Sequence, residues 1–252
     1  MSRPRPPLWA VPEDAAARLA LATAYPFAIP EDSYLFEDGA VLPLPADWRA
    51  EGRTPVLAVG SNQSPDQLAR KFAQLGGRVQ VPVTRCWLED FDVVYATHIT
   101  RYGAIPGNLH PAPGCRVRLS VTWFDAAQLA VVHETELTGE NYVYGRLDGA
   151  KATLADGRRL ETLQAYVSLN GVLNEGGRPI GLAALMAENR PHPALSQPEA
   201  LALLHGRHGR GSSLEAMILA SIGEPEERRR LTAILRRDAL RCDWEGLTIL
   251  ER

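Results

Sequence analysis

The sequence feature that most constrains the fold is a strand, a glycine turn and a helix start in direct succession. Pro55–Val59 is a short apolar run of the kind found in buried strands, and it stops at Gly60. Ser64 and Pro65 then mark a helix start, because serine accepts hydrogen bonds at the N-cap and proline suits the first helical position. Gln67 completes the pattern of a capping box. We therefore expect a buried strand that turns directly into a capped helix.

The rest of the chain predicts mixed α and β structure. Strand patterns dominate up to about residue 172, including a hairpin closed by Asp156-Gly157, and helical patterns dominate after it. Asp125 and Gln128 form a second capping-box pattern, which opens a helix inserted among the strands. The expected fold class is α+β in three parts. They are an N-terminal arm packed on the core (residues 1–53), a strand-rich domain (residues 54–172) and a helical C-terminal extension (residues 173–252).

Within the strand-rich part, three segments have distinct signals. Val79–Val83 and Phe91–Ile99 read as two separate strands, and Val117–Trp123 alternates apolar and polar residues as a half-buried strand does. Between the last two lies Tyr102–Gly114, which holds several prolines and glycines and therefore predicts turns.

Composition and charge narrow the class of protein. Apolar residues make up 45% of the chain and charged residues 23%, as in ordinary globular proteins. The net charge of −3 gives no general attraction to nucleic acid or an anionic membrane, so neither is expected as a partner, and any protein partner stays open. Residues 1–9 lead into no apolar signal core, and no apolar run reaches the ~18 residues of a membrane span. The expected location is the cytoplasm.

Cysteine and histidine spacing gives no sign of a metal or thiol site. The three cysteines lie far apart, and none has the spacing of a redox or zinc motif. His98, His110 and His133 combined with Cys115 match no ligand pattern, so no metal is expected. Nothing in the sequence sets Cys86 or Cys115 beside a base, which argues against a cysteine hydrolase.

The turn after the first strand is a candidate binding site. Backbone N–H groups at a strand–turn–helix junction converge above the strand, and the helix dipole there favours negative charge. Ser61 and Asn62 add side-chain donors beside Gly60, so a small carboxylate or an oxyanion would suit this loop. The pattern is neither a phosphate-binding loop nor a hydrolase nucleophile elbow. The alternative is a simple turn without a ligand.

Glu136 is the candidate acid/base. On a helix that continues past Val132, Glu136 lies about 20° from Leu129 and about 40° from Val132 around the axis, so it shares their apolar face. Glu134 lies on the opposite, wet side. A carboxylate on an apolar face costs free energy unless it is paired or protonated, and such a group suits proton transfer. The alternative is a helix that frays at Glu134 and leaves Glu136 in solvent. His133 falls close enough on the wheel to contact Glu136.

Together, the loop and the glutamate resemble the gamma-glutamylcyclotransferase family. That family carries a Tyr-Gly-Ser-Asn loop and a downstream catalytic glutamate, which is followed by a substrate-contacting tyrosine. Val59–Asn62, Glu136 and Tyr142 match these positions, and the resemblance spans residues 54–172. Two residues depart from the pattern. Val59 replaces the tyrosine and removes a ring and a hydroxyl from the pocket wall, and Leu137 follows the glutamate where glycine is typical.

The resemblance implies a small, strongly bent mixed β-barrel with flanking helices. It also implies an enzyme that cyclises a γ-glutamyl group to 5-oxoproline and releases an amine or amino acid. Glu136 would be the catalytic acid/base, and a small-molecule γ-glutamyl compound would be the partner, with no metal or organic cofactor. The implied substrate-binding residues are Val59, Gly60, Ser61, Asn62 and Tyr142.

Two other functions fit the sequence. In the first, the same fold binds a small acidic or amide ligand without chemistry, as the departures at Val59 and Leu137 suggest. In the second, the helical C-terminal part recruits a protein partner.

Overall fold

The computed structural model of the chain describes residues 11–137, 139, 141–242 and 245–252. Residues 1–9, where the sequence predicts no secretory signal, lie outside the described residues, as does the start of the expected N-terminal arm. Within the described ranges, no helix is both long enough and apolar enough to cross a bilayer.

Five strands close into a barrel, so the predicted α+β class with a small mixed barrel is confirmed. The order around it is β5-β3-β7-β6-β4, and β4 pairs back onto β5. All pairings are antiparallel except β3 with β7, which is parallel. The barrel strands are β3 (Thr54–Ala58), β4 (Gln80–Tyr95), β5 (Gly107–Phe124), β6 (Val143–Leu154) and β7 (Arg159–Val167).

The two longest strands correct the sequence prediction. Where two separate strands were expected, β4 runs unbroken, with an irregularity between Glu89 and Phe91 and a positive φ of 65° at Asp90. The predicted turns of Tyr102–Gly114 are wrong from Gly107 onward, because that stretch is the first half of β5. It pairs with the second half of β4. This long-range strand pairing outweighs the local preference of the prolines and glycines for turns.

Short strands extend the sheet. β1 (Tyr34–Glu37) pairs with β4, and β2 (Ala40–Pro43) pairs with β1. The region after residue 172, read as helical from sequence, also holds strands of two residues, which are too short to show a periodicity. These are β8 (Asn174–Glu175), β9 (Arg178–Pro179), β10 (Gly181–Leu182), β11 (Ala187–Glu188) and β12 (Ala194–Leu195), and β13 (Leu247–Glu251) follows at the chain's end.

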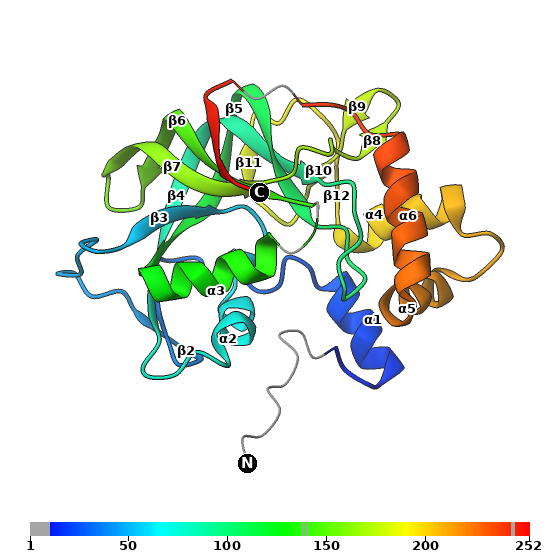
Figure 1. Cartoon of the computed structure of the whole chain (residues 1–252). Helices are drawn as coiled ribbons and strands as arrows, with labels where there is room; N and C mark the ends of the chain where they lie inside the picture. The colour runs from blue at the N-terminus through cyan, green and yellow to red at the C-terminus, as the bar shows by residue number, and fades with distance from the viewer. Residues whose placement is uncertain (1–10, 138, 140, 243–244) are drawn as a thin grey trace, which may run out of the picture.

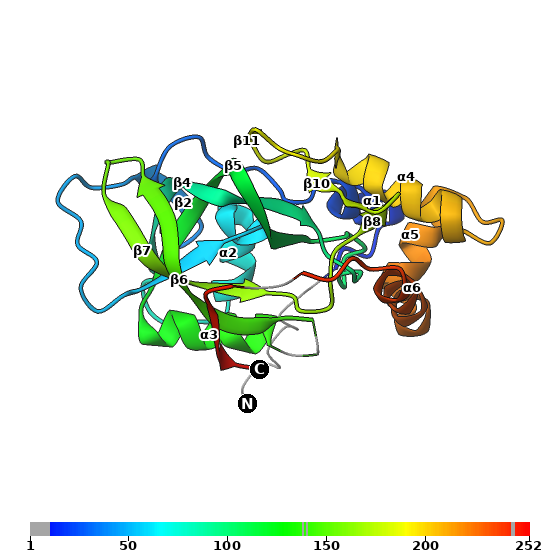
Figure 2. The same ribbon diagram turned by 90° about the horizontal axis from the view of Figure 1, so that it is seen from above.

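The helices form two groups (Figures 1 and 2). The first, α2 (Pro65–Phe72) and α3 (Ala126–Glu136), lies against one side of the barrel. The second lies beyond one end of it and confirms the helical C-terminal extension. Its members are α1 (Ala15–Thr23), α4 (Gln197–His208), α5 (Leu214–Gly223) and α6 (Pro225–Arg237).

One apolar core joins the barrel to the second helical group. Inside the barrel, Leu88, Leu119 and Leu163 are fully buried, and the same cluster continues into Leu201 on α4 and Ile218 on α5. A second cluster fills the space between the outer face of the strands and the pair α2 and α3. The division of the chain into three domains stays a prediction, but these clusters show which surfaces pack together.

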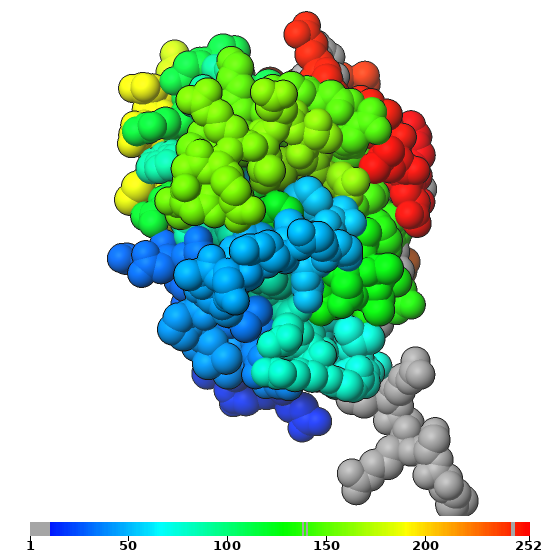
Figure 3. Space-filling model, turned by 90° about the vertical axis from the view of Figure 1, so that its left-hand side faces the viewer, coloured from blue at the N-terminus to red at the C-terminus, as the bar shows by residue number. Residues whose placement is uncertain are grey.

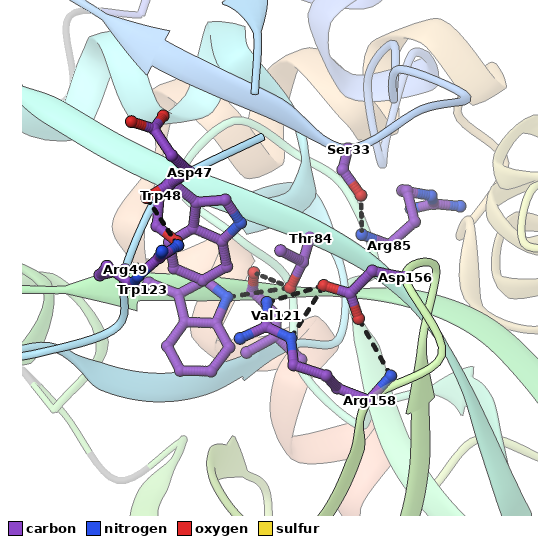
Figure 4. Close-up of polar contacts among 10 residues, drawn as sticks. All are labelled: Ser33, Asp47, Trp48, Arg49, Thr84, Arg85, Val121, Trp123, Asp156 and Arg158. Atoms are coloured by element: carbon purple, nitrogen blue, oxygen red, sulfur yellow. Dashed lines mark hydrogen bonds and ion pairs between the residues drawn. The ribbon is translucent and has the colours of Figure 1, made fainter. Parts of the chain in front are cut away.

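The segment between β2 and β3 packs against β5 and the β6–β7 turn through Trp48 (Figure 4). The Trp48 ring packs edge-on against Trp123 at 5.1 Å between ring centroids, and the Arg158 guanidinium lies 5.0 Å from the Trp48 centroid. The Trp123 indole N–H donates to the Thr84 hydroxyl at 2.9 Å. In Figure 3 this N-terminal segment (blue) lies on the surface between the β6–β7 hairpin (yellow-green) and the region of α2 (cyan).

The two capping boxes predicted from sequence have different outcomes. At α3, Asp125 accepts from the Gln128 N–H at 2.8 Å, and the Gln128 side chain accepts from the Asp125 N–H, so this box is confirmed. At α2 the prediction is wrong. Ser64 is the N-cap residue, but its hydroxyl is buried and caps no backbone N–H.

We expect Asp125→Ala to lower the free energy of unfolding by about 1 kcal/mol, because it removes the cap of α3. Ser64→Ala is the matched control and should change it by less than about 0.5 kcal/mol, because its hydroxyl makes no cap bond. Urea unfolding of both variants measures the difference. Equal losses in the two variants would contradict this account of the caps.

Candidate functional site

A cavity of about 360 Å³ lies where the barrel meets the second helical group. Its wall combines the loop after β3, the end of α3 and the start of β5 with Tyr25, just after α1, and Arg228 on α6. The site is therefore shared between the barrel and helical segments that precede and follow it in the chain.

All the candidate site residues from the sequence line this one cavity. They are the proposed acid/base Glu136 and the proposed substrate-binding residues Val59, Gly60, Ser61, Asn62 and Tyr142. The fold brings them together from three separate parts of the chain. Their individual roles stay predictions.

The loop after β3 has the expected strand–turn–helix form with one addition. Between Gly60 and the start of α2, Ser61–Gln63 forms a 3₁₀ turn. Residues at the start of a helical turn have no acceptor within it for their N–H groups. No acceptor is found among the described residues for the backbone N–H of Ser61 or Asn62. Both groups therefore remain available to an anionic ligand.

Glu136 sits at the cavity as the last residue of α3, so the alternative of a helix fraying at Glu134 is wrong. Its side chain is only 17% exposed. Its Oε1 accepts two hydrogen bonds, one from the Lys71 ammonium at 2.7 Å and one from Asn62 Nδ2 at 3.0 Å. The loop and the carboxylate, separated by 74 residues, are thus in direct contact.

Lys71 is the residue that sequence reasoning missed. Its side chain on α2 is completely buried, with Nζ also 2.5 Å from the Thr135 hydroxyl. A signal was present, because Lys71 lies three residues after Leu68 and four before Leu75, on the apolar face of that helix. A buried ammonium needs an anionic partner, and the fold supplies Glu136, whose Oε1 lies 2.7 Å from Nζ.

The two oxygens of Glu136 differ in their surroundings. Oε1 is held by Lys71 and Asn62, whereas no donor to Oε2 is found among the described residues. One oxygen is thereby fixed by protein donors, and the other is free to exchange a proton with a ligand in the cavity.

Four tyrosines surround the carboxylate: Tyr25, Tyr102, Tyr142 and Tyr166. Burial is the main cause that raises the pKa of each phenol, and the nearby charge of Glu136 raises it further. These hydroxyls therefore stay protonated and can act as hydrogen-bond donors at any physiological pH.

Two histidines lie near the tyrosines. His133, which the helical wheel placed close to Glu136, contacts the Tyr166 hydroxyl at 2.8 Å instead. His98 packs edge-on against Tyr142 at 5.1 Å between ring centroids and lines the cavity. No group of three or more His, Cys, Asp or Glu side chains in the described part of the chain is arranged to hold a metal ion.

We expect Glu136→Gln to lower the free energy of unfolding by about 3 kcal/mol, because it removes the carboxylate that forms an ion pair with the buried Lys71 ammonium. Adding Lys71→Met should recover most of that loss, because two neutral side chains then replace the pair. Urea unfolding of the wild type, both single variants and the double variant measures the coupling. Strictly additive losses would contradict a coupled pair.

The stability of the protein should also depend on pH through His98. Burial, followed by the charge of Arg236, lowers the pKa of its imidazole to about 3. An unfolded histidine titrates near pH ~6.5, so below that pH the unfolded chain binds a proton that the folded chain does not, and stability falls as pH drops. In His98→Gln, the loss of unfolding free energy between pH ~6.5 and ~4 should be smaller. An unchanged pH dependence in this variant would rule out the contribution.

Comparisons with known proteins give only distant similarities. No family model and no curated protein matches the chain. Among solved structures, a gamma-glutamyl cyclotransferase is 13% identical with a TM-score of 0.38, covering 77% of this chain and 92% of that one. An uncharacterized protein from Homo sapiens is 14% identical with a TM-score of 0.39, covering 78% and 93%. A protein from Arabidopsis thaliana known from a solution structure is 15% identical with a TM-score of 0.36, covering 48% and 72%. Identities and scores this low assign no activity to the chain, which leaves the site's own geometry as the basis for its function.

Proposed function

We propose that the chain is a gamma-glutamylcyclotransferase-like enzyme that converts a γ-glutamyl group to 5-oxoproline and releases an amine or amino acid. The observation that carries the proposal is the contact between Glu136 Oε1 and Asn62 Nδ2 at 3.0 Å, at the wall of a cavity of about 360 Å³. A proton-transfer group and a candidate oxyanion-binding loop thus face the same space.

The reaction needs one proton carrier. The substrate's own α-amine attacks its γ-carbonyl carbon, forming the lactam C–N bond, and the bond from that carbon to the leaving nitrogen breaks. Glu136 Oε2 takes one proton from the α-ammonium, which frees the attacking lone pair, and delivers it to the leaving nitrogen. It then accepts the second proton, which the new lactam nitrogen releases, and passes it to the departing amine, which leaves as an ammonium. No side-chain nucleophile is required, because well-aligned intramolecular attack can supply on the order of 7 kcal/mol of the barrier.

The remaining groups would bind and stabilise the reacting centre. The backbone N–H groups of Ser61 and Asn62 are free to donate to the α-carboxylate or to the oxyanion that develops on the γ-carbonyl. In this proposal Val59 and Gly60 form the wall beside them. Tyr142, a protonated phenol near Glu136, would contact the substrate.

The Lys71 ammonium has a supporting part in the proposal. By holding Oε1 together with Asn62, it fixes the rotation of the carboxyl group and directs the free Oε2 to the ligand. The proposed partner is a small γ-glutamyl compound. A cytoplasmic location and the absence of a nucleic-acid partner stay predictions from the sequence.

A second candidate is a binding module that recognises a γ-glutamyl or similar acidic ligand without converting it. Val59 favours it, because this residue at the cavity wall lacks the ring and hydroxyl of the tyrosine in the family pattern. The two functions differ in whether product forms.

We expect the wild-type protein to form 5-oxoproline from at least one member of a panel of γ-glutamyl amines and γ-glutamyl dipeptides, followed by mass spectrometry. Glu136→Gln combined with Lys71→Met should lose at least about 1000-fold in kcat/KM while remaining folded, because the proton carrier is gone.

The matched control is Glu161→Gln, an exposed carboxylate on β7 that does not line the cavity, which should keep most of the activity. No product from the whole panel would sink the enzyme proposal. Saturable ligand binding without product would then support the binding module.

A further inference from the structure

Tyr25 reaches the cavity from outside the barrel. It follows α1 in the chain, and its side chain is buried, with 4% of the residue exposed, at the cavity wall. The backbone N–H of Gly107, which is the first residue of β5, donates to its hydroxyl oxygen at 2.7 Å. This bond, between residues 82 apart, fixes the position of the phenol.

The hydroxyl of Tyr25 lies directly against the candidate binding loop. A Cβ atom built on Gly60 would be 1.9 Å from Tyr25 Oη and 3.0 Å from its Cζ. The close approach of Tyr25 requires glycine at position 60, because no side chain fits between the loop and the hydroxyl.

The hydroxyl proton of Tyr25 has no acceptor among the described residues. Its oxygen accepts the Gly107 bond, and the structure shows no bond in which the O–H donates. Burial, and then the neighbouring Tyr102, raise the pKa of the phenol well above its ordinary value, so the proton stays on it. The nearby charge of Glu136 acts in the same direction. A buried donor without an acceptor is costly, and a ligand oxygen in the cavity would satisfy it.

We propose that Tyr25 is a substrate-binding residue whose O–H donates to an oxygen of the γ-glutamyl group held beside Gly60. The accepted bond from Gly107 polarises the phenol and strengthens it as a donor. The proposed active site then includes a residue from the segment that precedes the barrel, since the Tyr25 hydroxyl does not belong to any barrel strand. The inference rests on the proposed function and names one more group that recognises the same substrate.

Tyr25→Phe tests the proposal, with Tyr95→Phe as the matched control. Tyr95 is also fully buried, but its hydroxyl donates to the Leu195 carbonyl at 3.0 Å and it does not line the cavity. With the γ-glutamyl compound that the wild type converts best, Tyr25→Phe should lower kcat/KM at least about tenfold, as loss of a hydrogen bond to a charged or developing oxyanion does. Tyr95→Phe should stay within about twofold.

A change of less than about twofold in Tyr25→Phe would overturn the inference while leaving the proposed function intact. If the wild-type protein forms no 5-oxoproline, both the proposed function and the inference about Tyr25 are refuted. Thermal unfolding separates binding from packing. A Tyr25→Phe protein with a lowered Tm but unchanged kcat/KM for its folded fraction would show that the hydroxyl is only structural, and this would also overturn it.

A stability cycle with Gly60→Ala checks the contact itself. Gly60→Ala alone should lower the Tm, and combining it with Tyr25→Phe should restore part of the loss, because the nearest clashing atom is then absent. The same loss with and without Tyr25→Phe would place the hydroxyl away from Gly60 and contradict the proposal.

Discussion

The ion pair between Lys71 and Glu136 is the interaction on which the candidate site depends. It joins α2 to α3 across 65 residues of sequence and places a fully buried ammonium against the cavity carboxylate. Neither charge is stable in this setting alone, because burying an unpaired ion costs several kcal/mol. Since Asn62 shares Oε1 with Lys71, the same contact holds the loop after β3 in place. Packing of two helices on the barrel thus fixes the geometry of the candidate site.

The cavity belongs to the junction of the barrel and the second helical group. Glu136 comes from α3 and Gly60 from the loop after β3, whereas Tyr25 and Arg228 come from segments that precede and follow the barrel in the chain. The apolar core that continues from the barrel into α4 and α5 fixes the position of these segments relative to the barrel. The Tyr25 hydroxyl lies directly against Gly60, so a segment that precedes the barrel forms part of the cavity wall beside this loop.

Structural features that depend on neighbouring residues were predicted from the sequence more successfully than features that depend on long-range contacts. The strand before Gly60, the capping box at Asp125 and the helical character of the C-terminal extension are each encoded in local patterns, and the structure has them. The wheel placed Glu136 on a buried face correctly, but it gave no hint of the partner. The capping box predicted at Ser64 is wrong, because the Ser64 hydroxyl is buried and makes no hydrogen bond to the helix N–H groups.

The sequence by itself determined the α+β class, the strand–turn–helix at Gly60 and the presence of a carboxylate on an apolar face, because such signals arise from neighbours along the chain. Tertiary structure alone decided the unbroken course of β4 and β5, the parallel pairing of β3 with β7, and the arrival of Lys71 and Tyr25 at the cavity. The physical reason is that strand register and buried polar contacts are selected by the whole fold, through pairing and desolvation energies that no local window contains.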